Sequence, residues 1–217
     1  MPPRKKYLRK RRKTYKPRTM IPKVMSSGMD QNQKLSFKFV DSLKLTTTFT
    51  GSIAASRFYV GNGIAYPSPD HTTHQPYGYD QWNGFFTSYT CVSSSIKVSV
   101  VAASGDGVIC VRPTRSGTGV DQSIKYMAER PNTKSILVSS SVPKIITSNA
   151  STLKVFGRPW KDASESYSAD YAANPGTLWY WLIEYQSPGE AVDVTASLLV
   201  EITYKCLLRK RSRFASS

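Results

Sequence analysis

The sequence predicts an all-β fold, and three observations support this prediction. Apolar and polar residues alternate with a period of two in several stretches after residue 33, as in half-buried strands. Clusters of Gly, Pro, Asn and Asp separate these stretches and are typical of turns. One stretch only, residues 120–130, has a helix-like pattern. A single sandwich of about eight strands, in particular a jelly roll, is the most economical architecture for this pattern.

The first predicted strand spans residues 34–49, where apolar residues occupy the odd positions and Lys, Ser and Thr most of the even ones. Val40 and Asp41 interrupt the alternation, and we interpret the interruption as a β-bulge. Residues 144–157 are expected to form a strand pair or one long bent strand. The other strands are expected at residues 52–61, 95–102, 107–114, 133–141, 176–186 and 191–206.

The stretch "LWYWLIEY", residues 178–185, is apolar at positions that face both sides of a strand. A strand of a two-layer sandwich normally shows one face to water, so either a loop or a neighbouring subunit is expected to cover the outer face. We favour the subunit, with Trp179 and Trp181 as the contact residues. The remaining aromatic residues are expected to pack in the core.

The charge of the chain is concentrated at its two ends. The 217 residues have a net charge of +16 from 30 Lys and Arg against 14 acids. Eleven basic residues lie in residues 1–23 and five lie from Lys205 onward, so the remaining fourteen balance all fourteen acids of the body. We therefore divide the chain into a basic arm at residues 1–33, a jelly-roll domain at 34–206 and a basic C-terminal tail at 207–217. Such asymmetry indicates a polyanionic partner.

The basic arm is expected to be disordered, because it carries like charge, little apolar surface and several prolines. Its cations neutralise phosphates without reading sequence, and its two tyrosines are expected to stack on unpaired bases. The run "RKRRK" at residues 9–13 also fits a nuclear-import signal. A charged run that only aids solubility is the plainer alternative. The expected nucleic-acid contacts are Arg4, Lys5, Lys6, Arg9, Lys10, Arg11, Arg12, Lys13, Lys16 and Arg18, the stacking residues Tyr7 and Tyr15, and a second basic contact at Arg209, Lys210, Arg211 and Arg213.

Chemical motifs are sparse, and the sequence predicts neither an enzyme nor a cofactor. His71 and His74 lack a third ligand at zinc spacing, so no metal site is expected. No phosphate-binding glycine loop, nucleophile elbow or paired carboxylate pattern occurs. The odd number of cysteines predicts buried free thiols and a reducing compartment. No apolar run reaches the ~18 residues of a membrane-spanning helix, so membrane insertion is not expected.

Three segments resemble the capsid proteins of circovirus-like viruses, which have circular single-stranded DNA genomes. These are the aromatic segment 79–101, the run "KVFG" at 154–157 with the stretch leading to residues 174–185, and the closing strand 193–206. The similarity extends over nearly the whole chain, but it consists of patterns and not of invariant motifs. The second basic run, "RKRSRF" at 209–214, is not required by the family.

The resemblance implies a jelly roll whose first and last strands are adjacent and antiparallel, so that the C-terminal basic run begins near the base of the arm. Exposure of that run on the outer surface is the rival possibility. The resemblance further implies a T=1 icosahedral shell of 60 identical subunits that packages single-stranded DNA. The expected locations are the virion and the host nucleus. The run at residues 9–13 adds an import receptor as a candidate host partner, and the Trp- and Tyr-rich loops at residues 66–90 add a cell-surface glycan. The implied strands, B to I, lie near residues 34–49, 52–60, 94–103, 106–114, 134–140, 143–156, 177–187 and 191–206.

Three other functions remain open at this stage. A satellite-type capsid protein that packages RNA has the same kind of basic arm, because the arm meets phosphates of either nucleic acid. A cellular single-strand-binding or ribosome-associated β protein predicts a small oligomer with a basic groove on its body. A carbohydrate-binding jelly roll would use the Trp- and Tyr-rich loops at residues 66–90, but it leaves the arm unexplained.

Overall fold

The computed structural model describes residues 32–47, 55–69, 74–83, 85–118, 124–139, 143–157, 165–187 and 194–211. All described residues belong to one compact unit, Gln31–Ser217. For residues 1–31 the predicted disorder of the arm lies outside the described residues, whereas Asn32 and Gln33, which were assigned to the arm, belong to a strand.

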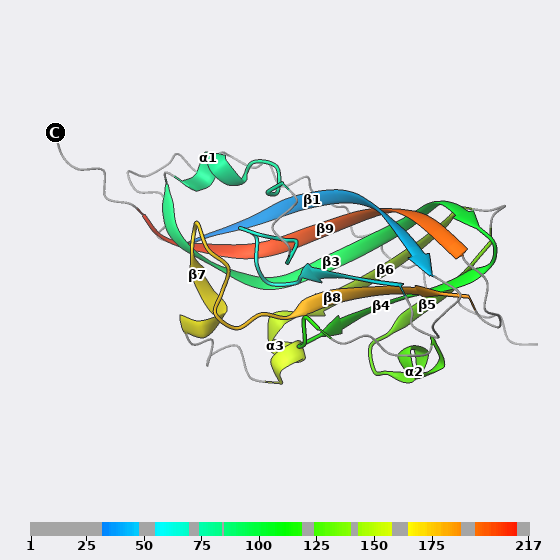
Figure 1. The fold of residues 1–217 in the computed structure, drawn as a ribbon. Helices are drawn as coiled ribbons and strands as arrows, with labels where there is room; N and C mark the ends of the chain where they lie inside the picture. The colour runs from blue at the N-terminus through cyan, green and yellow to red at the C-terminus, as the bar shows by residue number, and fades with distance from the viewer. Residues whose placement is uncertain are drawn as a thin grey trace, which may run out of the picture. The chain divides into compact units, whose positions relative to one another are not determined.

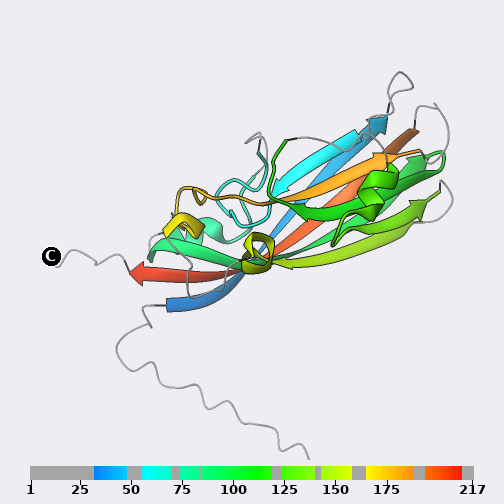
Figure 2. The ribbon, with the colours of Figure 1, turned by 90° about the horizontal axis from the view of Figure 1, so that it is seen from below.

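Nine strands of the described residues form two antiparallel sheets (Figures 1 and 2). The long-strand sheet has the order β1 (Asn32–Thr47), β9 (Val194–Arg211), β3 (Phe86–Ser104) and β6 (Lys144–Ser151), with β7 (Ser168–Asp170) paired to one end of β3. The short-strand sheet has the order β2 (Ala55–Val60), β8 (Tyr180–Gln186), β4 (Gly107–Thr114) and β5 (Lys134–Val138). Apart from β7, eight strands divide equally between two facing sheets, which confirms the predicted jelly roll.

Short helices accompany the sheets: α1 (Tyr79–Asn83), α2 (Ile124–Glu129) and α3 (Thr152–Phe156), with a 3-10 turn at Glu165–Tyr167. The helix expected within residues 120–130 corresponds to α2. Figure 1 places α2 on the side of the short-strand sheet that faces away from the long-strand sheet.

The core lies between the sheets and follows from the period-two pattern. On β1 the odd residues Phe37, Phe39 and Leu45 are buried, while the even residues Lys34 to Lys44 are mostly exposed. On β9 the even residues from Val194 to Leu208 are buried. Because successive side chains of a strand point to opposite faces, each sheet presents one apolar face to the other.

The predicted bulge at Val40 and Asp41 is wrong, because the pairing of β1 with β9 is unbroken from Asn32 to Thr47. Asp41 stays on the inward-facing side of the strand and accepts a hydrogen bond of 2.7 Å from the Tyr59 hydroxyl. A polar residue in an apolar row is thus satisfied by a partner on the other sheet and needs no extra residue in the strand. The irregularities lie instead in β3, between Cys91 and Ser93 and between Val100 and Ala102.

Three strand limits differ from the sequence expectation. The strand expected at 94–103 starts at Phe86, because residues 86–93 also pair with β7 and with the end of β9. The strand expected at 143–156 stops at Ser151, where α3 begins, and Gly157 ends that helix with a φ of 69°. The last strand continues beyond residue 206 to Arg211, so part of the predicted tail is strand.

Trp179 and Trp181 are fully buried within this one chain. The Nε1–H of Trp179 donates to Thr152 Oγ1 at 3.2 Å, and that of Trp181 donates to Ser94 Oγ at 2.9 Å. The indoles therefore fill the core and leave no surface for a neighbour. This corrects the expectation that the two tryptophans form a subunit contact.

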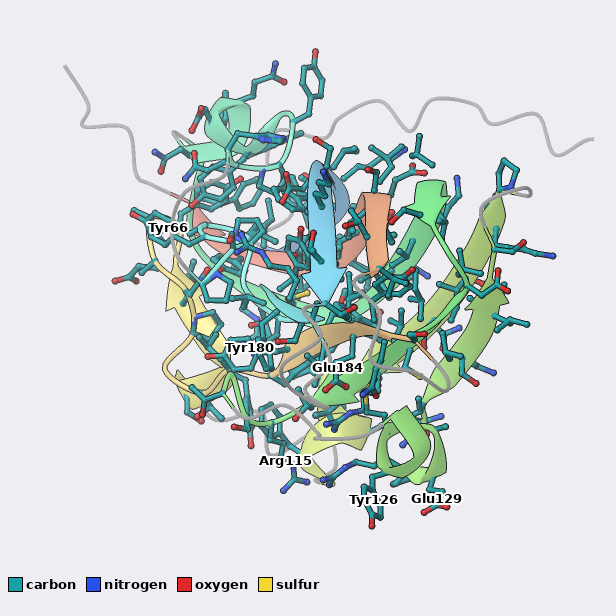
Figure 3. All side chains as sticks on the ribbon, turned by 45° about the vertical axis from the view of Figure 1, so that its right-hand side comes forward. Tyr66, Arg115, Tyr126, Glu129, Tyr180 and Glu184 are labelled. Carbon is teal, nitrogen blue, oxygen red and sulfur yellow. The ribbon has the colours of Figure 1, made fainter. Side chains whose placement is uncertain are left out.

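The outer face of β8 is covered by the chain itself, which explains why "LWYWLIEY" is apolar on both faces. Leu182 and Glu184 lie on that face and are 1% and 0% exposed. Helix α2 packs over β4 and β8, and its Met127 is buried against Cys110. Figure 3 shows Glu184 between the sheet and α2, whose Tyr126 and Glu129 point away from it. Arg112 Nε lies 3.8 Å from Glu184 Oε2, so the buried carboxylate has a cationic neighbour.

The three cysteines, Cys91, Cys110 and Cys206, are buried free thiols, as predicted. Burial raises the pKa of the Cys110 thiol to about 12, so it stays protonated at neutral pH. In the part of the chain that the structure describes, no group of three His, Cys, Asp or Glu has the geometry of a metal site. Within the same residues, no helix is long and apolar enough to span a membrane.

Candidate nucleic-acid interface

Most of the predicted nucleic-acid contacts lie outside the described residues. This holds for the ten cations from Arg4 to Arg18, for the stacking residues Tyr7 and Tyr15, and for Arg213. Lys210 and Arg211 are described by their backbone only, at the end of β9, whereas Arg209 is described with its partly exposed side chain.

The start of β1 and the end of β9 are neighbours in the long-strand sheet. Asn32, the first described residue, is directly opposite Arg209, and the antiparallel register continues through Lys34 and Leu207 (Figure 2). The chain therefore enters the described structure beside the basic end of β9. The adjacency of the first and last strands that the resemblance implied is present, and it brings Asn32 beside Arg209.

The outer face of the long-strand sheet carries a regular row of cations, which we call the cation ladder: Arg209, Lys34, Lys205 and Lys38. Arg209 is opposite Asn32, Lys34 opposite Leu207, Lys205 opposite Ser36 and Lys38 opposite Thr203. Each successive outward-facing row thus holds one cation, supplied alternately by β9 and β1. Because outward side chains recur every second residue, neighbouring rows are about 6.8 Å apart along the strands.

Two shallow depressions follow this face, and each is lined by one or two lysines of the cation ladder. One depression combines the polar residues Lys34, Ser36, Ser93 and Lys205 with apolar ones, Leu35, Val92, Cys206 and Leu207. The other is bordered by Lys38, Ser95, Lys97, Asn149, Glu201 and Thr203. Lysines, hydroxyls and amides that converge on a shallow surface suit the phosphate backbone of a nucleic acid.

Glu201 is bound between two lysines at the far end of the cation ladder. The Lys97 Nζ donates to Glu201 Oε1 at 2.7 Å, and the Lys38 Nζ pairs with Oε2. The hydrogen bonds from Lys38 and Lys97 lower the pKa of the Glu201 carboxyl to about 2. Within the described strands, Glu201 and, at the sheet edge, Asp170 of β7 are the acids on this face, so the face is strongly cationic.

We predict that Glu201 stabilises the fold at neutral pH and that its contribution is lost in acid. The pKa of its carboxyl falls from an ordinary 4.5 to about 2 on folding, so the contribution is complete above about pH 4.5 and fades toward pH 2. The Lys38 and Lys97 side chains are 58% and 45% exposed, which limits the effect at neutral pH to the order of 1 kcal/mol. Urea unfolding of the wild type and Glu201→Gln should show a difference that vanishes as the pH falls to 2. A difference independent of pH contradicts the prediction.

The sequence analysis missed Lys34, Lys38, Lys97 and Lys205 as one surface. Their outward orientation was visible in the alternation, since each occupies a polar position of a predicted strand. Which strands lie side by side was not visible, and this pairing alone brings β1, β3 and β9 together. The neutral charge balance of residues 24–204 concealed a cationic face.

The architecture places the chain in the class of double-sheet jelly rolls. No protein-family model matches the sequence, and no curated protein sequence matches it either. Its structural similarity is to solved virus structures. A chain of the Cocksfoot mottle virus structure aligns with a TM-score of 0.51 at 11% identity, covering 83% of this chain and 97% of that one.

Two further virus structures align less closely. The nodavirus particle of the giant freshwater prawn Macrobrachium rosenbergii gives a TM-score of 0.49 at 11% identity, over 87% of this chain and 99% of that one. The 60-mer BFDV capsid protein gives a TM-score of 0.43 at 14% identity, over 87% and 100%. At these identities the similarity concerns the fold, which the alignment with the Cocksfoot mottle virus chain supports.

Proposed function

We propose that this protein is a viral capsid subunit that assembles into a small icosahedral shell and packages single-stranded DNA through its basic arm. The observation that carries the proposal is the position of charge on a jelly roll. Strand β1, which follows the arm in the sequence, begins beside Arg209, and the cation ladder continues from that point along the open face of the same sheet. On the other sheet, α2 packs over β4 and β8, and the charged pair Arg112 and Glu184 is largely buried there.

The parts of the chain have separate roles in this proposal. The ten cations from Arg4 to Arg18 neutralise phosphates, and Tyr7 and Tyr15 stack on unpaired bases. Arg209, Lys210, Arg211 and Arg213 form the second basic contact beside the base of the arm. The run "RKRRK" at residues 9–13 binds a nuclear-import receptor in this proposal, because short runs of Lys and Arg are typical of nuclear-import signals.

The proposal predicts particles of defined size. Electron microscopy of the purified protein should show uniform small spheres, and mass photometry should give about 1.5 MDa, the mass of sixty chains of 24.2 kDa. Nucleic acid recovered from nuclease-treated particles should be degraded by DNase and resist RNase. A protein that remains a monomer or small oligomer under all assembly conditions contradicts the capsid role.

An RNA-packaging capsid protein is the second candidate. Lysine and arginine bind the phosphates of RNA as well as those of DNA, and no described feature of the cation ladder selects the sugar. Spherical particles whose contents are degraded by RNase and resist DNase would establish this candidate and overturn the choice of DNA.

A further inference from the structure

We propose that the outer face of the long-strand sheet is itself a binding track for the backbone of single-stranded nucleic acid. In this track the cation ladder contacts successive phosphates, and Glu201 limits it at one end. The inference rests on the proposed function for the identity of the partner, but it assigns binding to residues of the β domain and not to the arm.

The spacing of the cation ladder carries the first part of the argument. Its four cations lie in four consecutive rows, so about 20 Å separates Arg209 from Lys38 along the strand direction. A stacked nucleic-acid strand has one phosphate about every 3.4 Å. Rows about 6.8 Å apart therefore meet every second phosphate of a stacked strand, or every phosphate of a strand stretched to twice that rise.

Polar residues between the cations can also contact a phosphate backbone. Ser36 and Ser93 lie in the depression of Lys34 and Lys205, while Ser95, Asn149 and Thr203 lie in that of Lys38. Hydroxyl and amide groups donate hydrogen bonds to phosphate oxygens, as Lys does. In the described residues, neither depression is lined by an aromatic side chain. The track is therefore built to bind backbone without base stacking, in contrast to the two tyrosines of the arm.

Glu201 limits the track at one end, because its carboxylate competes with phosphate for two lysines. Its carboxylate pairs with both Lys38 and Lys97, and it stays ionised at neutral pH because its pKa is about 2. Lys38 is thus partly neutralised, whereas the other three cations of the cation ladder have no acid opposite them in the pairing of β1 with β9. Removing the charge of Glu201 should extend the track toward Lys97.

The test measures binding of the full-length protein to fluorescent oligothymidylate across a range of salt concentrations. Lys34→Gln/Lys205→Gln removes two charges from the cation ladder, and Lys134→Gln/Lys154→Gln removes two exposed charges from β5 and α3 as a matched control. The slope of log K against log salt should become less steep by about 1.4 in the first variant and stay unchanged in the second. Glu201→Gln should bind more tightly than the wild type. Oligouridylate should give the same differences, since only phosphates are contacted.

Several outcomes overturn the inference. Equal slopes for the two double variants would mean that the total charge of the protein, and not this face, governs binding. The proposed function, which depends on the arm, would be unaffected. A ladder variant that binds normally but fails to form particles would assign the face to an acidic segment of a neighbouring subunit. A flat slope for the wild type would instead contradict the packaging function itself. Circular dichroism of each variant checks that the fold is kept.

Discussion

Removal of residues 1–31 is expected to leave a folded β domain that has lost most of its affinity for single-stranded nucleic acid. The deletion removes eleven basic residues, ten of them between Arg4 and Arg18. If those ten each meet a phosphate, the slope of log K against log salt becomes less steep by about 7. The slope that remains should be about −5, the value for seven cations, namely the four of the cation ladder together with Lys210, Arg211 and Arg213. Fluorescence anisotropy with oligothymidylate measures both slopes.

The end of the deletion is set by the pairing of β1. Asn32 and Gln33 are opposite Arg209 and Leu208, so a deletion that extends past residue 31 removes part of the sheet. The fold of the shortened chain should match that of the full chain in circular dichroism and in its urea midpoint. A matched control keeps the full length and replaces the ten arm cations with Gln, and it should lose the same affinity. A truncated domain that unfolds, or that binds as tightly as before, contradicts the assignment of residues 1–31 as a separate binding arm.

Trp181→Ala is expected to have the largest effect on stability, a loss of about 3–5 kcal/mol. Trp181 is fully buried, its ring lies 5.2 Å from that of Trp179, and its Nε1–H donates to Ser94 Oγ. The substitution leaves a cavity between the sheets and removes that hydrogen bond. Because domains of this kind are stable by only about 5–15 kcal/mol, much of the variant should be unfolded at physiological temperature.

Two further variants keep this prediction measurable if Trp181→Ala does not fold. Trp181→Phe retains most of the volume and loses one hydrogen bond, so a loss of about 1–2 kcal/mol is expected. Tyr77→Ala, at a side chain that is 88% exposed, should change the free energy of unfolding by less than about 0.5 kcal/mol. Urea unfolding followed by circular dichroism measures all three. If Trp181→Ala were as stable as the wild type but no longer assembled, Trp181 would have to lie in a subunit contact, and the conclusion from its burial would be wrong.

A strand could be predicted where apolar and polar residues alternate along the chain. The alternation from Leu35 to Leu45 indicated an inward-facing row, and the structure buries three of its residues and packs the half-buried Leu35 and Leu43 against the core. The limits of β3 were not predictable, because residues 86–93 owe their strand conformation to β7 and to the end of β9. A partner that is distant in the sequence leaves no periodic signal in the strand itself.

The stretch "LWYWLIEY" was predicted to contact a neighbouring subunit, whereas in the structure α2 covers its outer face. Its two apolar faces were visible in the sequence, and they required a cover on the outer side. The sequence did not indicate that α2, some sixty residues earlier, supplies that cover. Hydrophobicity shows that a surface is buried, but it does not identify the element that buries it.

By itself, the sequence determined that this chain has a neutral all-β body and cationic ends, because composition and period-two alternation are local properties. The tertiary structure alone decided that Asp41 faces Tyr59, that Trp179 and Trp181 fill the core, and that cations from β1 and β9 alternate on one open face. The physical reason is that strand pairing joins residues as far apart as Lys34 and Leu207, and no pattern within either strand specifies its neighbour.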